Sequence, residues 1–283
     1  MPAGYWIIRS YEAGIVGEKV KFWIPEKRHP KSFRKKKTEP RKQEQNEYNT
    51  ERRLARLINA NCDPGWVLLG MDYSETGMDR LCKQAMSSGG GQSQLPQCRA
   101  DMKSAPTVGC EEAIKKAAER EMRLALRRVG RELLKRGADL KYIAVTSDMD
   151  GETGETVRIH HHLLVPEEAC EIFARKWKIL GRVHWDRLQR QDDYTPIAAY
   201  LIRQARYLED AKKFTCSQNL VRPLPKDRIA FTDAELRVPR GAKLLHRSEF
   251  KPGAPQYIRF VFPDTTRTRG GGRKGQLIIG NQE

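Results

Sequence analysis

The sequence predicts an α+β fold in which helices pack on an antiparallel sheet. Three runs rich in Val, Ile and Leu, at 66–73, 140–147 and 157–165, have the composition of strands. Segments with apolar residues at helical spacing lie between and after these runs. The last two runs are joined by the polar stretch 148–155, whose Asp, Gly and Glu residues favour a turn. We therefore expect these two strands to pair as an antiparallel hairpin that carries a histidine cluster.

The charge of the chain indicates a polyanionic partner. Its 283 residues include 53 Lys and Arg against 36 Asp and Glu, a formal net charge of +17. A field of this sign attracts nucleic acid first and an anionic membrane surface second. We find no apolar run long enough to cross a membrane and no secretion signal, so we expect no membrane partner. The six cysteines form no C-x-x-C pair, which indicates reduced thiols and a cytoplasmic location.

Residues 1–48 should form an N-terminal hairpin and a basic arm. Two short apolar alternations, at 5–8 and 20–24, can pair with Gly14 and Gly17 at the turn. The following segment, 25–45, carries nine Lys or Arg against three acids and has little to bury. Such a composition is typical of a flexible arm that contacts phosphates, or of a solvated linker.

The central region, residues 49–223, should contain the sheet and its helices. Within it, residues 74–109 are rich in Gly, Ser, Gln and Pro, and we expect a flexible insertion there. Residues 224–283 contain a single late strand and should form a C-terminal extension with a basic, Gly-rich tail. Apolar spacing predicts helices at 49–61, 111–136, 167–180 and 197–207.

The histidine strand offers a metal site. Side chains on a strand alternate between faces, so His160 and His162 share one face, about 6–7 Å apart, while His161 points to the other. Two neutral imidazoles on one face can chelate a divalent metal. The alternative is a half-solvated surface cluster. A hard cation such as Mg²⁺ or Mn²⁺ would also want an oxygen ligand, and we expect Asp148, at the end of the partner strand, to supply it.

Other carboxylates remain open as ligands, and each can equally be a solvated turn residue. They are Asp150, Glu152 and Glu155 in the turn and Asp72 on the first core strand. We expect His184 to be a surface or packing residue rather than a ligand.

A tyrosine on the helix after Pro196 is a candidate nucleophile. Tyr200 shares a helix face with Arg203 and Tyr207, which follow it by three and seven residues. A cation one turn from a tyrosine can hold a phosphate and favour the phenolate. The alternative is that Tyr200 is simply an apolar-face aromatic that packs on the core.

These residues resemble the motifs of HUH endonucleases. The family has His-hydrophobic-His on a strand and Tyr-x-x-Lys on a later helix, and this chain has His160-His161-His162 and Tyr200-Leu201-Ile202-Arg203. Arg in place of Lys keeps the charge and adds a fork that can bind phosphate through two nitrogens. Family members tend to have Glu before the histidine strand where this chain has Ser147-Asp148, which puts the third metal ligand in doubt.

The resemblance extends over about residues 50–223 and is closest to the replication-associated proteins of phages and integrative elements. This chain shares four features with those proteins. They are the RIHHH strand at 158–162, the Gly-Arg pair at 181–182, the Asp-Arg-Leu segment at 186–188 and the Ser-x-Asn-Leu motif at 217–220. The resemblance implies DNA contacts from Arg158, Lys212, Lys213, Ser217 and Asn219.

What the resemblance implies is a metal-dependent, site-specific nicking and joining of DNA that starts rolling-circle replication. Tyr200 would attack single-stranded or origin DNA and keep the 5′ phosphate, and Arg203 would hold that phosphate. The released 3′ hydroxyl would prime a host DNA polymerase in a bacterial cytoplasm. Tyr207 could be a second nucleophile or a packing residue. No Walker-type loop is present in the sequence, so a helicase would be a separate host protein.

Two other classes of protein stay open. One is an HUH relaxase or transposase that uses the same residues on mobile-element DNA; a nucleophile placed after the histidines favours an initiator or a transposase over a relaxase. The other is a non-enzymatic basic DNA-binding protein whose histidines are structural.

Overall fold

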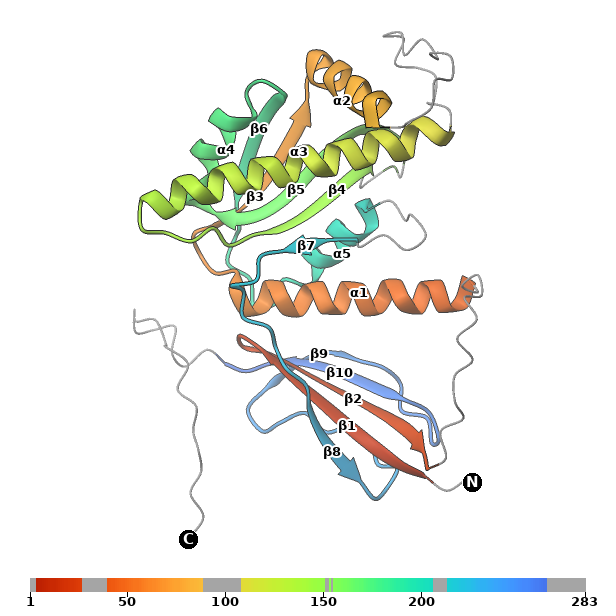
Figure 1. The fold of residues 1–283 in the computed structure, drawn as a ribbon. Helices are drawn as coiled ribbons and strands as arrows, with labels where there is room; N and C mark the ends of the chain where they lie inside the picture. Colours follow the sequence, from red (N-terminus) through yellow and green to blue (C-terminus); the bar gives the residue numbers. More distant parts are fainter. Residues whose placement is uncertain are drawn as a thin grey trace. The chain divides into compact units, whose positions relative to one another are not determined.

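A computed structural model of the chain describes residues 4–26, 40–88, 108–150, 153, 155–205 and 213–263. The chain divides into two compact units. The terminal unit combines Met1–Lys31 with Leu224–Glu283, and the central unit is Ser32–Pro223. Each unit has its own five-stranded sheet (Figure 1). Among the described residues, no helix has both the length and the apolar character needed to cross a membrane.

The terminal unit is an antiparallel sheet with the strand order β8-β1-β2-β10-β9. The expected N-terminal hairpin is confirmed, with Gly14 at the turn in a left-handed conformation (φ 62°). Gly17 is not part of the turn, because it lies in β2 beneath the ring of Phe260, where a Cβ atom would be only 2.3 Å from that ring. The strands are β1 (Gly4–Ala13), β2 (Val16–Pro25), β8 (Lys226–Ala230), β9 (Lys243–Arg247) and β10 (Gln256–Val261).

The expectation of a strand-poor C-terminal extension is wrong. Strands β8 and β10 flank the N-terminal hairpin, so both ends of the sequence build one sheet. The edge strands β8 and β9 expose most of their side chains, and therefore lack the apolar alternation by which a strand is recognised.

A buried lysine ties the two ends of the terminal unit together. The Lys21 ammonium lies 2.5 Å from a carboxylate oxygen of Asp233 and donates to the carbonyl of Ala234 at 2.8 Å. It also lies 4.9 Å from the centre of the Trp6 ring. A buried charge needs such partners, and here they come from a segment more than two hundred residues later in the chain.

The central unit has an antiparallel sheet with the order β6-β3-β5-β4-β7, so the histidine strand is its central strand. The expected α+β class and the antiparallel pairing of β4 with β5 are confirmed. The strand β6, which pairs with β3, was not expected. The strands are β3 (Trp66–Tyr73), β4 (Ile143–Met149), β5 (Thr156–Pro166), β6 (Gly181–Arg187) and β7 (Thr215–Cys216).

Helices cover both faces of this sheet (Figure 1). Helices α2, α3 and α4 pack on the face to which His161 points, and α1 and α5 pack on the face of His160 and His162. A short 3-10 turn at Glu167–Ala169 precedes α4. The helices are α1 (Pro40–Asn61), α2 (Glu75–Ser88), α3 (Val108–Lys135), α4 (Cys170–Trp177) and α5 (Thr195–Gln204).

Two expectations for flexible segments are corrected. The first part of the expected insertion at 74–109 is helix α2, which buries Leu81 and Ala85 against the core. Apolar residues at 78, 81, 82 and 85 give this helix one buried face despite the polar composition around it. Helix α1 begins at Pro40, inside the expected basic arm. Residues 89–107 lie outside the described part of the chain.

Candidate metal and nucleophile site

The ring nitrogens of His160 and His162 converge on one point above the sheet. Their Nε2 atoms are 3.0 Å apart. The Nδ1 atom of His160 lies 2.9 Å from the carbonyl oxygen of Arg158 and must donate to it, because a carbonyl only accepts. In the neutral ring this leaves the lone pair of His160 on Nε2, the atom that faces His162.

This arrangement fits a metal ion. Two nitrogens bound to one metal at about 2.1 Å and at a right angle to each other are about 3.0 Å apart. Burial, together with the neighbouring His160 and His184, lowers the pKa of His162 to about 4. The imidazole is therefore neutral near pH 7, and the neutral ring is the form that binds metal.

Tyr200 lies beside the histidine pair. Its ring centre is 6.0 Å from that of His162, on the face of the sheet covered by α5. Helix α5 is held there by Ala198, Leu201 and Ile202, which are buried against α1 and the sheet. Near the C-terminal end of α5, the Ser147 hydroxyl donates to the carbonyl of Gln204.

The start of helix α5 is fixed by a carboxylate, in a way the sequence did not suggest. The helix begins at Thr195, and the residue before it, Tyr194, makes no side-chain cap hydrogen bond. Instead the Asp193 carboxylate accepts from the backbone N–H and the hydroxyl of Thr195, at 3.0 and 2.6 Å. Asn59 of α1 donates to the same carboxylate oxygen at 3.0 Å. These bonds anchor the helix that carries Tyr200 to α1.

His161 is a buried structural residue on the opposite face. Its two ring nitrogens lie 2.9 Å from the hydroxyl oxygens of Tyr73 and Thr146. Its ring also packs edge-on against Trp177. Burial, with a smaller effect of the flanking histidines, lowers the pKa of His161 to about 3, so the ring is neutral. His161 thus points away from the face that carries His160 and His162, as the alternation of strand side chains predicts.

Asp148 does not join the histidine pair as the expected third ligand. The pairing of β4 with β5 slips at this residue, and Ser147 is the β4 residue opposite His160. Ser147 therefore occupies the position on the histidine face that Asp148 was expected to hold. Within the described part of the chain, no three His, Cys, Asp or Glu side chains gather into a metal-binding group.

The face of the histidine pair also carries His184, which was expected to be a surface or packing residue, and Asp72, which was one of the carboxylates left open as ligands. Gly70 pairs with His162 on one side and with His184 on the other, and the His184 ring covers the space where a Cβ atom of Gly70 would stand. Asp72 pairs with His160, and its carboxylate is 3.4 Å from the His184 ring. These side chains lie close together because β3 pairs with β5 on one side and with β6 on the other.

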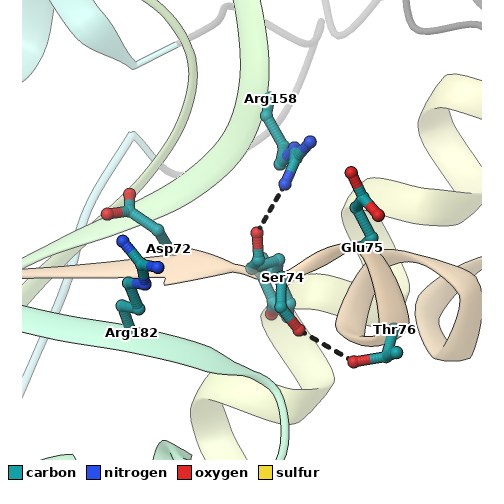
Figure 2. Close-up of a pocket in the computed structure, with 7 residues that line it drawn as sticks. Asp72, Ser74, Glu75, Thr76, Arg158 and Arg182 are labelled. Atoms are coloured by element: carbon teal, nitrogen blue, oxygen red, sulfur yellow. Dashed lines mark hydrogen bonds between the residues drawn. The ribbon is translucent and has the colours of Figure 1, made fainter.

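The expected DNA-contacting residues have different surroundings. Arg158 lines a pocket at the end of β3 and donates to the carbonyl of Tyr73 at 2.9 Å (Figure 2). Lys213 pairs with Glu47 at 2.8 Å and exposes only 6% of its side chain. Ser217 accepts from the backbone N–H of Tyr142, at the end of β4 away from the histidines. Asn219 is exposed, and its amide is 3.4 Å from the carbonyl of Leu140.

These contacts give Lys213, Ser217 and Asn219 structural partners, and their DNA contacts stay a prediction. Arg203 is exposed on α5, one turn after Tyr200. Tyr207, Lys212 and Glu152 lie outside the described residues.

Comparisons of the chain with family models, with curated proteins and with solved structures found no match. The case for function therefore depends on the site itself. It consists of two imidazoles whose Nε2 atoms converge at metal-ligand spacing and a half-buried tyrosine beside them.

Proposed function

We propose that the central unit is a metal-dependent DNA endonuclease and strand transferase of the HUH type that starts rolling-circle replication. The observation that carries the proposal is the distance of 6.0 Å between the Tyr200 and His162 rings, next to two converging Nε2 atoms. The proposed chelating pair lies on β5 and the proposed nucleophile lies on α5. Both elements pack on the same apolar core, which holds them in place. A structural pair would use the same 3.0 Å distance for a hydrogen bond between the two rings, and the metal dependence of the assay below separates the two possibilities.

Tyr200 is the proposed nucleophile. Its oxygen attacks a phosphorus atom of single-stranded origin DNA, a Tyr–O–P bond forms, and the bond from phosphorus to the 3′ oxygen breaks. The tyrosine proton is lost to solvent and the departing 3′ oxygen gains a proton. In the joining step a 3′ hydroxyl attacks the same phosphorus and releases Tyr200. One phosphoester replaces another in each step, so no ATP is needed.

His160 and His162 would hold a divalent cation, Mg²⁺ or Mn²⁺, through their Nε2 atoms. Such a cation, when bound, polarises a phosphate oxygen and stabilises the charge that develops during attack. The carbonyl of Arg158 fixes the ring orientation of His160. Arg203, which is exposed one helical turn after Tyr200, would bind the phosphate that the tyrosine retains.

The proposed partners follow from this chemistry. The free 3′ hydroxyl is a primer for a host DNA polymerase, and a host helicase would separate the strands ahead of it. The formal charge of +17 supports a DNA substrate.

A covalent-capture assay tests the proposal. The protein is incubated with labelled single-stranded DNA that contains the replicon's origin, with and without Mn²⁺, and is analysed on a denaturing gel. We expect a metal-dependent protein–DNA adduct that is lost in Tyr200→Phe and in the double variant His160→Ala/His162→Ala.

Two matched controls keep folding defects apart from chemistry. Tyr48→Phe removes a hydroxyl from another helical tyrosine of the same unit, and His246→Ala removes an exposed imidazole from the terminal unit. Both should keep the adduct. An adduct that persists in Tyr200→Phe would move the nucleophile elsewhere. DNA binding without any adduct would favour the non-enzymatic binder.

A further inference from the structure

A pocket of about 550 Å³ opens on the central unit (Figure 2), and one of its lining residues, Asp72, pairs with His160. It lies where β3 ends and α2 begins, between Arg158 of β5 and Arg182 of β6. A volume of this size is typical of a site for one small ligand group. The polar side chains that line it are those of Asp72, Ser74, Glu75, Thr76, Arg158 and Arg182.

The pocket begins at the residues that pair across the sheet with His160. Asp72 pairs with His160 on one side and with Arg182 on the other. Arg158 precedes His160 by two residues and therefore lies on the same face, about 6–7 Å further along the strand. A DNA strand bound at the histidines could thus extend one nucleotide into this pocket.

The charges in the pocket favour a nucleobase over a phosphate. Two guanidinium groups, of Arg158 and Arg182, face two carboxylates, of Asp72 and Glu75, so the side chains have no surplus positive charge. A phosphate would be repelled by both carboxylates. A base presents hydrogen-bond donors and acceptors together, and the pocket offers partners for both.

Two contacts hold the polar groups in place. Arg158 donates to the carbonyl of Tyr73 at 2.9 Å, which keeps its guanidinium at the rim of the pocket. The hydroxyl oxygens of Ser74 and Thr76 are 3.0 Å apart at the start of α2. Groups ordered before binding cost less conformational entropy when a ligand arrives.

We propose that this pocket binds one unstacked base of the DNA strand, with a preference for guanine. Guanine offers two acceptors, O6 and N7, which suit an arginine fork, and amino and ring N–H donors, which suit a carboxylate. The other bases lack this combination of an acceptor pair and a donor pair. The inference rests on the proposed function, because it takes single-stranded DNA as the ligand.

Selection from a randomised single-stranded DNA library tests the base preference. The library is bound to Tyr200→Phe protein in the presence of Mn²⁺, so that no strand is cleaved, and the bound molecules are sequenced. We expect guanine to be enriched at one position by roughly fivefold or more. The enrichment should disappear when Arg182→Gln or Glu75→Gln is added.

Arg187→Gln is the matched control for Arg182→Gln. Both arginines are exposed on β6, but Arg187 pairs with Glu167 and does not line the pocket. The control should keep the guanine enrichment. No enrichment, enrichment of another base, or enrichment unchanged in both pocket variants would overturn the proposal. An equal loss of affinity for all sequences in Arg182→Gln would also overturn it and indicate a phosphate contact.

The pocket and the nicking chemistry can fail separately, because the selection measures binding alone. A guanine preference that depends on Arg182 would stand even if no adduct with Tyr200 formed. An adduct formed without any such preference would leave the nuclease proposal intact and remove the base pocket.

Discussion

At the scale of single residues, the histidines of β5 have different surroundings on the two faces of the strand. His160 and His162 face α5 and Tyr200, and His161 is enclosed by Tyr73, Thr146 and Trp177. A one-residue shift in register would exchange these surroundings. The buried hydrogen bonds of His161 therefore help to keep the other two histidines on the face covered by α5.

The buried His161 should make stability depend on pH. Its folded-state pKa of about 3 lies below the ordinary value of 6.5, so folding favours the neutral ring. This contribution is fully present above about pH 6.5 and is lost as the pH falls toward 3. Between pH 7 and pH 5 the free energy of unfolding should fall by about 2 kcal/mol more in the wild type than in His161→Gln.

Urea unfolding at pH 5 and pH 7 measures this difference. Comparison of the two proteins cancels the contributions of the other histidines and of the carboxylates. The same pH dependence in both proteins would show that His161 is not the group responsible.

The residues of the site differ in how far sequence could predict them. Strand alternation correctly placed His160 and His162 on one face, and helical spacing correctly selected the face of Tyr200. The prediction that Asp148 joins the histidine pair was wrong because the pairing of β4 with β5 slips at this residue, and the sequence does not show such a slip. His184 was expected to be a surface or packing residue, and its position next to His162 could not be predicted because it depends on the pairing of β3 with β6.

At the scale of elements, β6 depends on close backbone approach. Gly181 begins this strand, and a Cβ atom there would lie 1.8 Å from the carbonyl oxygen of Asp72. This contact is with backbone, so relief would require the two strands to separate. Gly181 therefore lets β6 pair with β3 and brings Arg182 and His184 to the site.

Gly181→Ala should lower the free energy of unfolding by about 2 kcal/mol or more, through overpacking. Gly130→Ala in α3 is the control, because the nearest atom to a Cβ there is 3.8 Å away. In a helix interior this change should stabilise the protein by up to about 1 kcal/mol. Chemical denaturation of both variants measures the two effects. If Gly181→Ala were neutral, the tight β3–β6 pairing would be incorrect.

The core strands and the long helices were predictable, because each has a regular apolar pattern in its own sequence. Strand β6 exposes five of its seven residues, and β7 has only two residues, so neither has such a pattern. Helix α2 was hidden by the polar composition of the region around it. These elements form because they pair with segments that are distant in sequence, and the local sequence gives little indication of that pairing.

At the scale of the whole molecule, the excess of positive charge should dominate DNA affinity. With a net charge of +17, binding should release counterions from the DNA. We expect the affinity for single-stranded DNA to fall by about tenfold or more between 50 and 200 mM salt. Fluorescence anisotropy with a labelled oligonucleotide measures this. An affinity independent of salt would contradict a phosphate-dominated interaction.

The organisation of the chain was the hardest feature to predict. Strands β1 and β2 pair with β8 and β10, which follow the whole central unit in sequence. Sequence patterns describe each strand separately and do not record which strands pair across such a distance. The regions expected as an N-terminal hairpin and a C-terminal extension are therefore parts of one unit.

The central claim is that Tyr200 carries the DNA strand, and mass spectrometry of the trapped adduct tests it most directly. After nuclease and trypsin digestion, Tyr200 falls in the peptide Gln191–Arg203 and Tyr207 in the peptide Tyr207–Lys212. We predict a nucleotide on the first peptide, and fragmentation should assign it to Tyr200 rather than to the buried Tyr194. A nucleotide on Tyr207, or on any residue other than Tyr200, would contradict the account.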